Sequence, residues 1–159
     1  MNQHFKKLYL ENQICFPLYA ASRLTTKVYG PYLKELDLTY PQYLVMMVLW
    51  KEDHQTVNRI GERLLLESNT LTPLLKRLEQ KGLLSRKRSS LDERSVVVSL
   101  YPKGEILKEK AVSIPDKILG DISGSTMTAE EIRIFQHTLL KLVDALNAKI
   151  PNDTKQDNI

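Results

Sequence analysis

Cysteine is almost absent from this sequence, which holds Cys15 as its only one among 159 residues. A single cysteine excludes a disulfide within the chain and a zinc site built from several thiolates. The three histidines, His4, His54 and His137, lie in unrelated segments without the spacing of metal ligands. We therefore expect no metal and no cofactor. Cys15 is left as either a small apolar side chain or a free thiol with chemistry of its own.

Long hydrophobic runs are lacking as well. The only uninterrupted apolar run near the start, Ile14 to Ala21, is short, contains Pro17 and continues into a polar helical pattern. It predicts neither a secretory signal nor a membrane span. A chain of this length suits one domain with a core and is short for two. We expect a single domain over 1–159, in the cytoplasm and without membrane contact.

Apolar residues recur every three or four positions over most of the chain, which predicts a mainly helical fold. Alternation over 84–88 and 96–100, around a charged turn at 89–93, adds a small β-hairpin. The order of the elements predicts a winged helix-turn-helix over 39–100. Helices at 12–36 and 102–150 would form a dimerisation region, the second of them kinked at Pro115. Residues 1–11 would be a partly ordered arm and 151–159 a disordered tail.

Several helix ends are marked by capping signals. Thr39 and Thr128 each stand three residues before a Gln or Glu, which is the spacing of a capping box. Thr56 is a candidate N-cap for a short helix, and Lys81-Gly82 would end the helix after it. The helix that opens at Thr39 is expected to bury four residues, Tyr43, Met46, Met47 and Leu49.

The excess positive charge is confined to one stretch. Between Lys76 and Arg94 there are seven Lys or Arg and three acidic residues, a net of +4 that equals the net charge of the whole chain. A local positive field beside a helix-turn-helix indicates a nucleic-acid surface. The alternative is the solvated face of a hairpin. RNA is disfavoured because the stretch lacks the interleaved aromatics that stack on unpaired bases.

The helix over 68–80 has the composition of a recognition helix. Short polar residues near its start suit base edges, and longer cations suit phosphates. Arg94 beside Asp92 suits a minor groove, with the carboxylate holding the guanidinium extended. Two such units related by a two-fold axis would span a palindromic operator in double-stranded DNA. The candidate DNA-binding residues are Ser68, Asn69, Thr70, Thr72, Lys76, Arg77, Arg86, Lys87, Arg88, Asp92 and Arg94.

The last helix leaves two interpretations open. Its apolar residues alternate at spacings of three and four, forming a narrow seam that is typical of a helix packed on a partner. The same seam could be an ordinary core face. Its members are Ile132, Phe135, Leu139, Leu142, Leu146 and Ile150.

Cys15 also has two interpretations. It falls near a predicted helix start, where the dipole favours a thiolate, and Tyr19, Tyr29 and Tyr40 could stabilise that thiolate by hydrogen bonding. Without further information, a buried structural cysteine remains the alternative.

Four segments resemble the MarR family of winged-helix transcription regulators, and within it the single-cysteine repressors of organic hydroperoxide resistance (OhrR type). The likeness runs from about Leu10 to Ile150, and its most specific parts are the CF-x-LY and DERSV motifs. The segments are LENQICFPLYAASR, LDLTYPQYLVMMVLW, LTPLLKRLEQKGLLSRKRSSLDERSVVVSL and KEKAVSIPDKILG.

The resemblance implies a homodimer that represses its promoter while Cys15 is reduced and releases DNA when an organic hydroperoxide oxidises it. Tyr29 and Tyr40, with Tyr19, would be hydrogen-bonding partners of Cys15, some of them across the dimer. A low-molecular-weight thiol could then join the oxidised sulfur. The resemblance also places Pro73 on the major-groove helix and Asp92 with Arg94 at the wing tip. Pro17 and Tyr101-Pro102 depart from the family pattern without removing a functional residue.

Two other functions compete with this one. A MarR-type repressor released by a non-covalent phenolic ligand would make Cys15 incidental. A cysteine-dependent peroxidase would need a resolving thiol, which the chain lacks. We expect a regulator and no enzyme.

Overall fold

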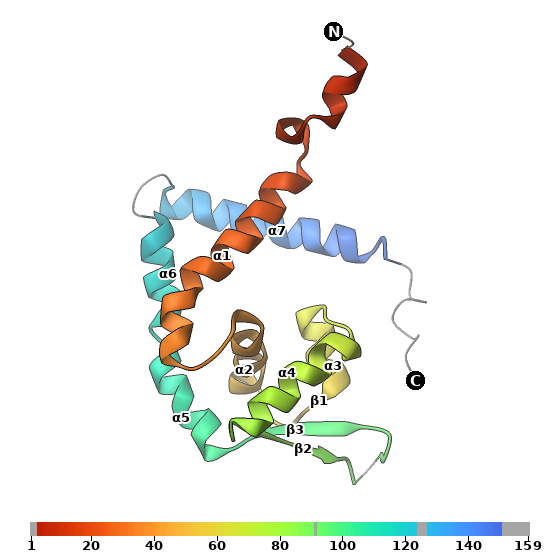
Figure 1. The fold of residues 1–159 in the computed structure, drawn as a ribbon, viewed down its shortest axis with the longest axis vertical. Coiled ribbons are helices and arrows are strands. Elements are labelled where there is room, and N and C mark those ends of the chain that lie inside the picture. The colour runs from red at the N-terminus through yellow and green to blue at the C-terminus, as the bar shows by residue number, and fades with distance from the viewer. Residues whose placement is uncertain (1–2, 91, 124–126, 151–159) are drawn as a thin grey trace. The chain divides into compact units, whose positions relative to one another are not determined.

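A computed structural model describes residues 3–90, 92–123 and 127–150. The chain forms two compact units, Met1–Tyr40 and Pro41–Ile159. The tail expected at 151–159 lies outside the described residues. The mainly helical, winged-helix fold expected from the sequence is confirmed, and Figure 1 shows its helices and small sheet.

The first unit consists of two short 3₁₀ helices, η1 (Gln3–Leu8) and η2 (Leu10–Asn12), followed by α1 (Cys15–Glu35). The arm has local order because Asn12 Nδ2 donates to Lys6 O at 2.7 Å and Gln13 Nε2 donates to Tyr9 O at 3.3 Å. Pro17 stands in the first turn of α1, where a missing N–H costs no helical hydrogen bond.

The winged helix-turn-helix lies in the second unit apart from Tyr40, the first residue of α2. Its elements are α2 (Tyr40–Lys51), β1 (Gln55–Thr56), α3 (Val57–Leu64), α4 (Ser68–Gln80), β2 (Leu84–Arg88) and β3 (Val96–Leu100). The sheet is antiparallel in the order β1-β3-β2, so β2 is an edge strand of the wing. β1 was not predicted, because two residues are too short to show an alternating pattern.

Three predicted helix ends are confirmed. Thr56 Oγ1 accepts from Arg59 N at 3.2 Å at the start of α3, and Thr128 forms a capping box with Glu131. Gly82 has a φ of +69° after α4. Its N–H donates to Glu79 O at 2.9 Å and that of Leu83 to Leu78 O at 3.1 Å, the two bonds of a Schellman motif.

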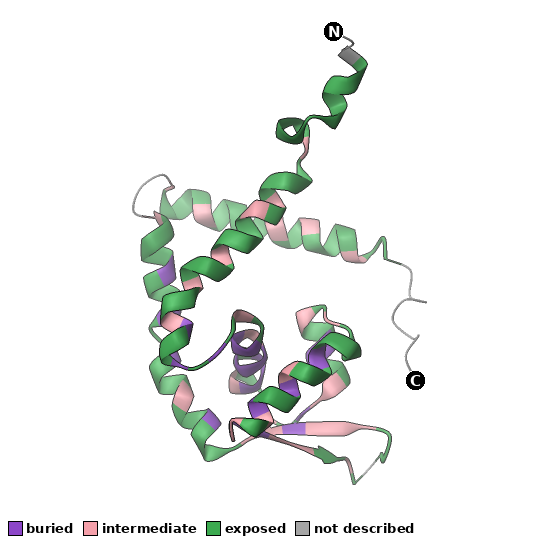
Figure 2. Cartoon of the chain, in the orientation of Figure 1, coloured by how far each residue is buried: buried purple, intermediate pink, exposed green. Residues whose placement is uncertain are grey.

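The core of the second unit lies between α2, α3, α4 and the sheet, where Figure 2 shows the buried positions gathered. Tyr43, Met46 and Leu49 are buried as predicted, but Met47 is 43% exposed. The prediction for Met47 was wrong: α2 is buried around most of its circumference, and Met47 lies on the one narrow side that faces solvent. The fully buried members are Val45, Met46, Ile60, Leu71, Leu75, Leu78, Leu84 and Val98.

The chain leaves the sheet through α5 (Pro102–Ala111), α6 (Ile114–Ser123) and α7 (Ala129–Asn147). The kink expected at Pro115 is a break, and Pro115 lies in the first turn of α6, where proline is tolerated. Trp50 Nε1 donates to Gly104 O at 2.8 Å, and Lys108 Nζ donates to Trp50 O at 2.9 Å. These two bonds fasten α5 to α2. Among the described residues, none of the helices is both long and apolar enough to cross a membrane.

Candidate nucleic-acid interface and sensing cysteine

The first turns of α4 present the predicted short polar residues to solvent. Ser68, Asn69, Thr70 and Thr72 are all exposed, as is Pro73 behind them. Asn69 Nδ2 donates to Glu67 Oε2 at 3.3 Å, and Thr70 Oγ1 donates to Asn69 Oδ1 at 3.1 Å. These bonds hold the side chains near the helix start, which is where a helix in a major groove meets base edges.

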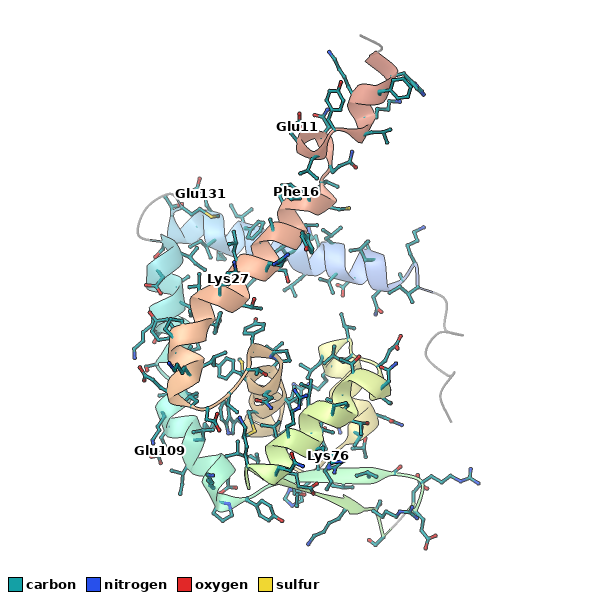
Figure 3. All side chains as sticks on the ribbon, in the orientation of Figure 1. Glu11, Phe16, Lys27, Lys76, Glu109 and Glu131 are labelled. Carbon is teal, nitrogen blue, oxygen red and sulfur yellow. The ribbon has the colours of Figure 1, made fainter. Side chains whose placement is uncertain are left out.

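Five of the predicted cations form an exposed set. Lys76 and Arg77 lie on the next turn of α4, and Lys76 is labelled there in Figure 3. Lys87 and Arg88 lie at the outer end of β2, and Arg94 on the turn that follows it. The arrangement offers two positive surfaces, one on α4 and one on the wing, which suits phosphate contacts on both sides of a groove.

Arg86 differs from the other predicted cations because its guanidinium already has a partner. Its Nε and Nη2 donate to Glu79 Oε2 at 3.0 and 2.7 Å, and its backbone N–H donates to Glu79 Oε1 at 3.0 Å. The side-chain hydrogen bond from Arg86, more than any other contact, holds the pKa of Glu79 below its ordinary value.

The wing turn is built around Asp92. Its carboxylate accepts from Ser95 Oγ at 2.6 Å and from the backbone N–H of Arg94 at 3.0 Å. These bonds, the Ser95 hydroxyl first, lower the pKa of Asp92. The sequence suggested that Asp92 holds the Arg94 guanidinium, whereas the bond found here goes to the backbone. Asp92 therefore shapes the turn from which the exposed Arg94 side chain projects.

A hollow of about 230 Å³ lies between α4, the start of α3 and the wing. The residues that line it are Thr56, Val57, Asn58, Thr72, Leu75, Arg86, Arg94, Ser95 and Val96. The N-terminal end of α3 and its polar side chains thus lie beside the candidate DNA-binding residues Thr72 and Arg94. Sequence reasoning missed Asn58, although its place two residues after the predicted N-cap Thr56 was a usable signal.

Cys15 is the first residue of α1, as predicted, and it is exposed. It makes no hydrogen bond with any other residue that the structure describes. Within one chain, therefore, Cys15 is not a buried structural cysteine. The thiol is open to a reagent or to a second chain.

The three tyrosines fall into two groups. Tyr29 and Tyr40 lie together, with ring centroids 4.9 Å apart and ring planes at 61°. Burial raises the pKa of Tyr40. Fourteen residues separate Tyr29 from Cys15, and at 1.5 Å per helical residue they stand about 21 Å apart along α1. Within one chain, Tyr29 and its ring partner cannot reach the sulfur.

Tyr19 is one helical turn from Cys15 and is held by a different contact. Arg23 Nη1 donates to the Tyr19 hydroxyl at 2.8 Å, and the guanidinium carbon lies 5.6 Å from the ring centroid. Cys15, Tyr19 and Arg23 follow at spacings of four, so they share one face of α1. Tyr19 is the only predicted tyrosine that helix geometry allows near Cys15 of the same chain.

The structure buries no residue of α7. Of the predicted seam, Phe135, Leu146 and Ile150 are exposed, while Ile132, Leu139 and Leu142 are half-buried. Three further apolar side chains outside the seam, Ile134, Leu140 and Val143, are exposed as well. Figure 2 shows the contrast with α2. Exposed apolar residues in such number along one helix indicate a surface that another protein surface covers.

Metal chemistry finds no support in the part of the chain that the structure describes. No group of three His, Cys, Asp or Glu side chains lies close enough to hold an ion there.

Residues 27–111 match the sequence profile of the transcriptional regulator SarA/Rot family. The chain is also 50% identical, over 149 residues, to the organic hydroperoxide resistance transcriptional regulator of Bacillus subtilis strain 168. That match covers 94% of this chain and 99% of the relative.

Solved structures give the same picture. Reduced AbfR bound to DNA, a protein of Staphylococcus epidermidis, is 37% identical with a TM-score of 0.76, and the match covers 95% of this chain and 100% of AbfR. AbfR is also known in a disulfide-containing form, with a TM-score of 0.57 over 92% of this chain and 96% of its own. A mutant of MarR from E. coli shares the fold, at 22% identity, with a TM-score of 0.65 over 82% of this chain and 96% of its own.

Proposed function

Because the chain belongs to the SarA/Rot family of winged-helix transcriptional regulators, we propose that it is a dimeric repressor which releases its operator when an organic hydroperoxide oxidises Cys15. The predicted family resemblance is confirmed, and the chain is a homologue of a regulator of organic hydroperoxide resistance. The observation that carries the sensing step is the exposed, unpaired Cys15 at the first residue of α1.

DNA binding is assigned to the start of α4, the cations of α4 and the wing. The exposed Ser68, Asn69, Thr70 and Thr72 face the bases, while Lys76 and Arg77 take phosphates. Lys87, Arg88 and Arg94 extend the contact along the wing. A relative with the same fold has been solved on DNA in its reduced form, which supports this assignment.

The chemistry begins at the sulfur of Cys15. The thiolate attacks one peroxide oxygen, an S–O bond forms, the O–O bond breaks and the alcoholate leaves and takes up a proton. The sulfur loses two electrons and becomes a sulfenic acid. A low-molecular-weight thiol then displaces water and leaves a mixed disulfide on Cys15. The chain has no second cysteine, so any disulfide joins it to another molecule.

A dimer is part of the proposal for two reasons. The apolar face of α7 needs a covering surface, and Tyr29 and Tyr40 reach Cys15 only from a second chain. A bulky or charged group on Cys15 then disturbs the contact between protomers. The two recognition helices lose the spacing that lets both enter their half-sites.

The protein is proposed to act in the cytoplasm and to respond stoichiometrically, as a regulator and not as an enzyme; its relatives are named as transcriptional regulators. A peroxidase would need a thiol to regenerate Cys15 on each cycle. A repressor controlled by a phenolic ligand would bind and release DNA without any change at Cys15.

The decisive experiment compares wild type with Cys15→Ser on a duplex that the reduced wild type selects from a random pool. Binding is followed by fluorescence anisotropy with and without cumene hydroperoxide. We expect both proteins to bind when reduced and only wild type to release the duplex on oxidation. Release of Cys15→Ser by the hydroperoxide would place the switch elsewhere, and release of both by a phenol without oxidant would favour the non-covalent repressor.

A salt titration of the same complexes tests the electrostatic part. The logarithm of the affinity is expected to fall with the logarithm of salt, with a slope of roughly −0.9 for each phosphate contact. A flat salt dependence would contradict the assigned cationic surface.

A further inference from the structure

The wing is fastened to the recognition helix by one side-chain pair at its base. Glu79, on the last turn of α4, accepts from the backbone N–H and from the guanidinium of Arg86 in β2 at 2.7 to 3.0 Å. Both carboxylate oxygens are used, and the two side chains are only 33% and 25% exposed. Two guanidinium N–H groups donate to Oε2 and the backbone N–H donates to Oε1, so the contact is directional as well as attractive.

The backbone bond has a consequence of its own. β2 is the edge strand of the sheet, and alternate residues of an edge strand direct their N–H groups away from the neighbouring strand. The N–H of Arg86 is one of these outward groups, and Glu79 satisfies it. The carboxylate therefore holds the strand itself and not only a flexible side chain.

Apolar packing fixes only the base of the wing. Leu78, Leu83 and Leu84 are buried there. The hollow begins at this base, where Arg86 lines it, and it extends to Arg94 and Val96 of the wing. Beyond Arg86 the side chains of Lys87, Arg88 and Arg94 are exposed. The angle of the wing therefore depends on contacts near its base, namely the pairing of β3 with β1 and the Glu79–Arg86 pair.

The negative charge of Glu79 is unfavourable both at its place in α4 and beside the proposed DNA surface. An acid at the C-terminal end of a helix is disfavoured by the helix dipole. It also lies within the basic stretch that would face phosphates, where a negative charge weakens DNA binding. The three hydrogen bonds from Arg86 offset these two electrostatic costs.

We propose that Glu79 and Arg86 form a clamp that fixes the angle between the wing and α4, so that Arg86 positions the wing and does not itself contact DNA. This inference rests on the proposed DNA-binding function. It replaces the sequence-based expectation that Arg86 is a DNA-binding residue. In this proposal the clamp sets the position of Arg94, which lies at the outer end of the wing.

The direction of the change in DNA affinity distinguishes the clamp from a purely electrostatic effect. Glu79→Ala and Glu93→Ala remove the same charge, but Glu93 is an exposed residue of the wing turn. Electrostatics alone predicts tighter DNA binding for both. The clamp predicts that Glu79→Ala binds the selected duplex roughly tenfold more weakly than wild type, about the loss of a single base contact, while Glu93→Ala does not. Binding of Glu79→Ala to a scrambled duplex should be unchanged or tighter.

Arg86→Lys gives a second measurement that keeps the charge. Lysine cannot form this guanidinium contact, so its discrimination between selected and scrambled duplex should fall between wild type and Glu79→Ala. If Arg86→Lys only made the protein less stable, its affinities for the selected and the scrambled duplex would fall together and its melting temperature would be lower.

A readout without DNA separates this proposal from the proposed function. Hydrogen exchange at the Arg86 amide should be slow in wild type and Glu93→Ala and fast in Glu79→Ala. Unchanged exchange in Glu79→Ala, or binding of the selected duplex as tight as that of Glu93→Ala, would overturn the clamp. Failure of wild type to prefer its selected duplex would instead contradict the proposed function, with the exchange result still deciding the clamp.

Discussion

The winged-helix region and the helix α7 differ in how many of their residues are buried. Residues 41–100 supply most of the buried core, including Val45, Met46, Leu71 and Val98, within a single chain. α7 has nineteen residues and buries none of them. The first region is complete as one molecule, and the second carries an apolar surface that one molecule leaves uncovered.

This difference indicates which part of the proposed function requires a second chain. The DNA-reading surface takes its shape from caps, core and wing clamp inside one protomer. The sensing end does not, because Cys15 has no partner among the described residues and Tyr29 and Tyr40 lie far along α1. The shape of each proposed DNA-binding surface is therefore set within one chain, whereas sensing, and binding to a whole palindrome, are proposed to depend on the dimer.

The largest expected effect comes from breaking the α7 surface. Leu139→Asp with Leu142→Asp places two charges on the apolar seam, and the cost of burying them should dissociate the dimer. Losing the link between two half-sites should weaken palindrome binding by about a thousandfold. Sedimentation velocity and anisotropy would measure both.

Lys141→Ala is the matched control, since Lys141 is exposed on the same helix. It should leave the protein dimeric. A monomeric control, or a double variant that remains a tight dimer, would contradict the assignment of α7.

A second substitution breaks the winged-helix side of the comparison. A Cβ at Gly104 would overlap the carbonyl oxygen of Leu83, where α5 passes the base of the wing. Gly104→Ala should destabilise the fold by about 2–4 kcal/mol, measured by urea denaturation. Gly120→Ala is its control, because nothing lies within 4 Å of a Cβ there. It should stabilise α6 by roughly 0.5–1 kcal/mol.

A smaller effect is expected at the start of α7. Thr128 Oγ1 accepts from the N–H of Glu131 at 3.2 Å, and Thr128→Ala removes that cap. The free energy of unfolding should fall by about 1 kcal/mol. Thr138→Ala makes the same change within the helix, where alanine is the better helix former, so it should raise stability by roughly 0.5 kcal/mol. Equal effects of the two variants in thermal melts would argue against the cap.

The smallest effect concerns pH and the wing turn. The pKa of Asp92 is lowered in the folded protein, so its carboxylate stabilises the turn at neutral pH. That contribution begins to fade as pH falls below the ordinary pKa of an aspartate and is lost below the lowered one. NMR titration of the Arg94 and Ser95 amides should show the transition. Asp92→Asn should abolish it, and a transition at the ordinary value would mean that the bonds do not form in solution.

Much of the fold could be predicted because local chemistry and the final structure agree. Thr56, Gly82 and Thr128 act at helix ends as their residue types predict. The polar start of α4 and the five exposed cations also lie where periodicity places them. Such features depend on residues a few positions apart, so they survive without knowledge of the rest of the chain.

The remaining features could not be predicted, because they depend on distances between residues far apart in the sequence, which no sequence pattern contains. Arg86 looks like its neighbours Lys87 and Arg88 in sequence, yet Glu79 holds it at 2.7 Å. The strand β1 exists because residues 55–56 meet β3, with Gln55 opposite Val98. The helix over 102–122 is broken before Pro115 where a kink was expected.

By itself, then, the amino-acid sequence determined most of the helices and several of their ends, the hairpin, the position of the positive charge and the single thiol. Hydrogen-bonding caps, periodic apolar faces and charge are properties of short segments. Only the tertiary structure decided which cation is tied to an acid, which apolar seam stays uncovered and which tyrosine can approach Cys15. Those outcomes depend on the packing of residues distant in the chain.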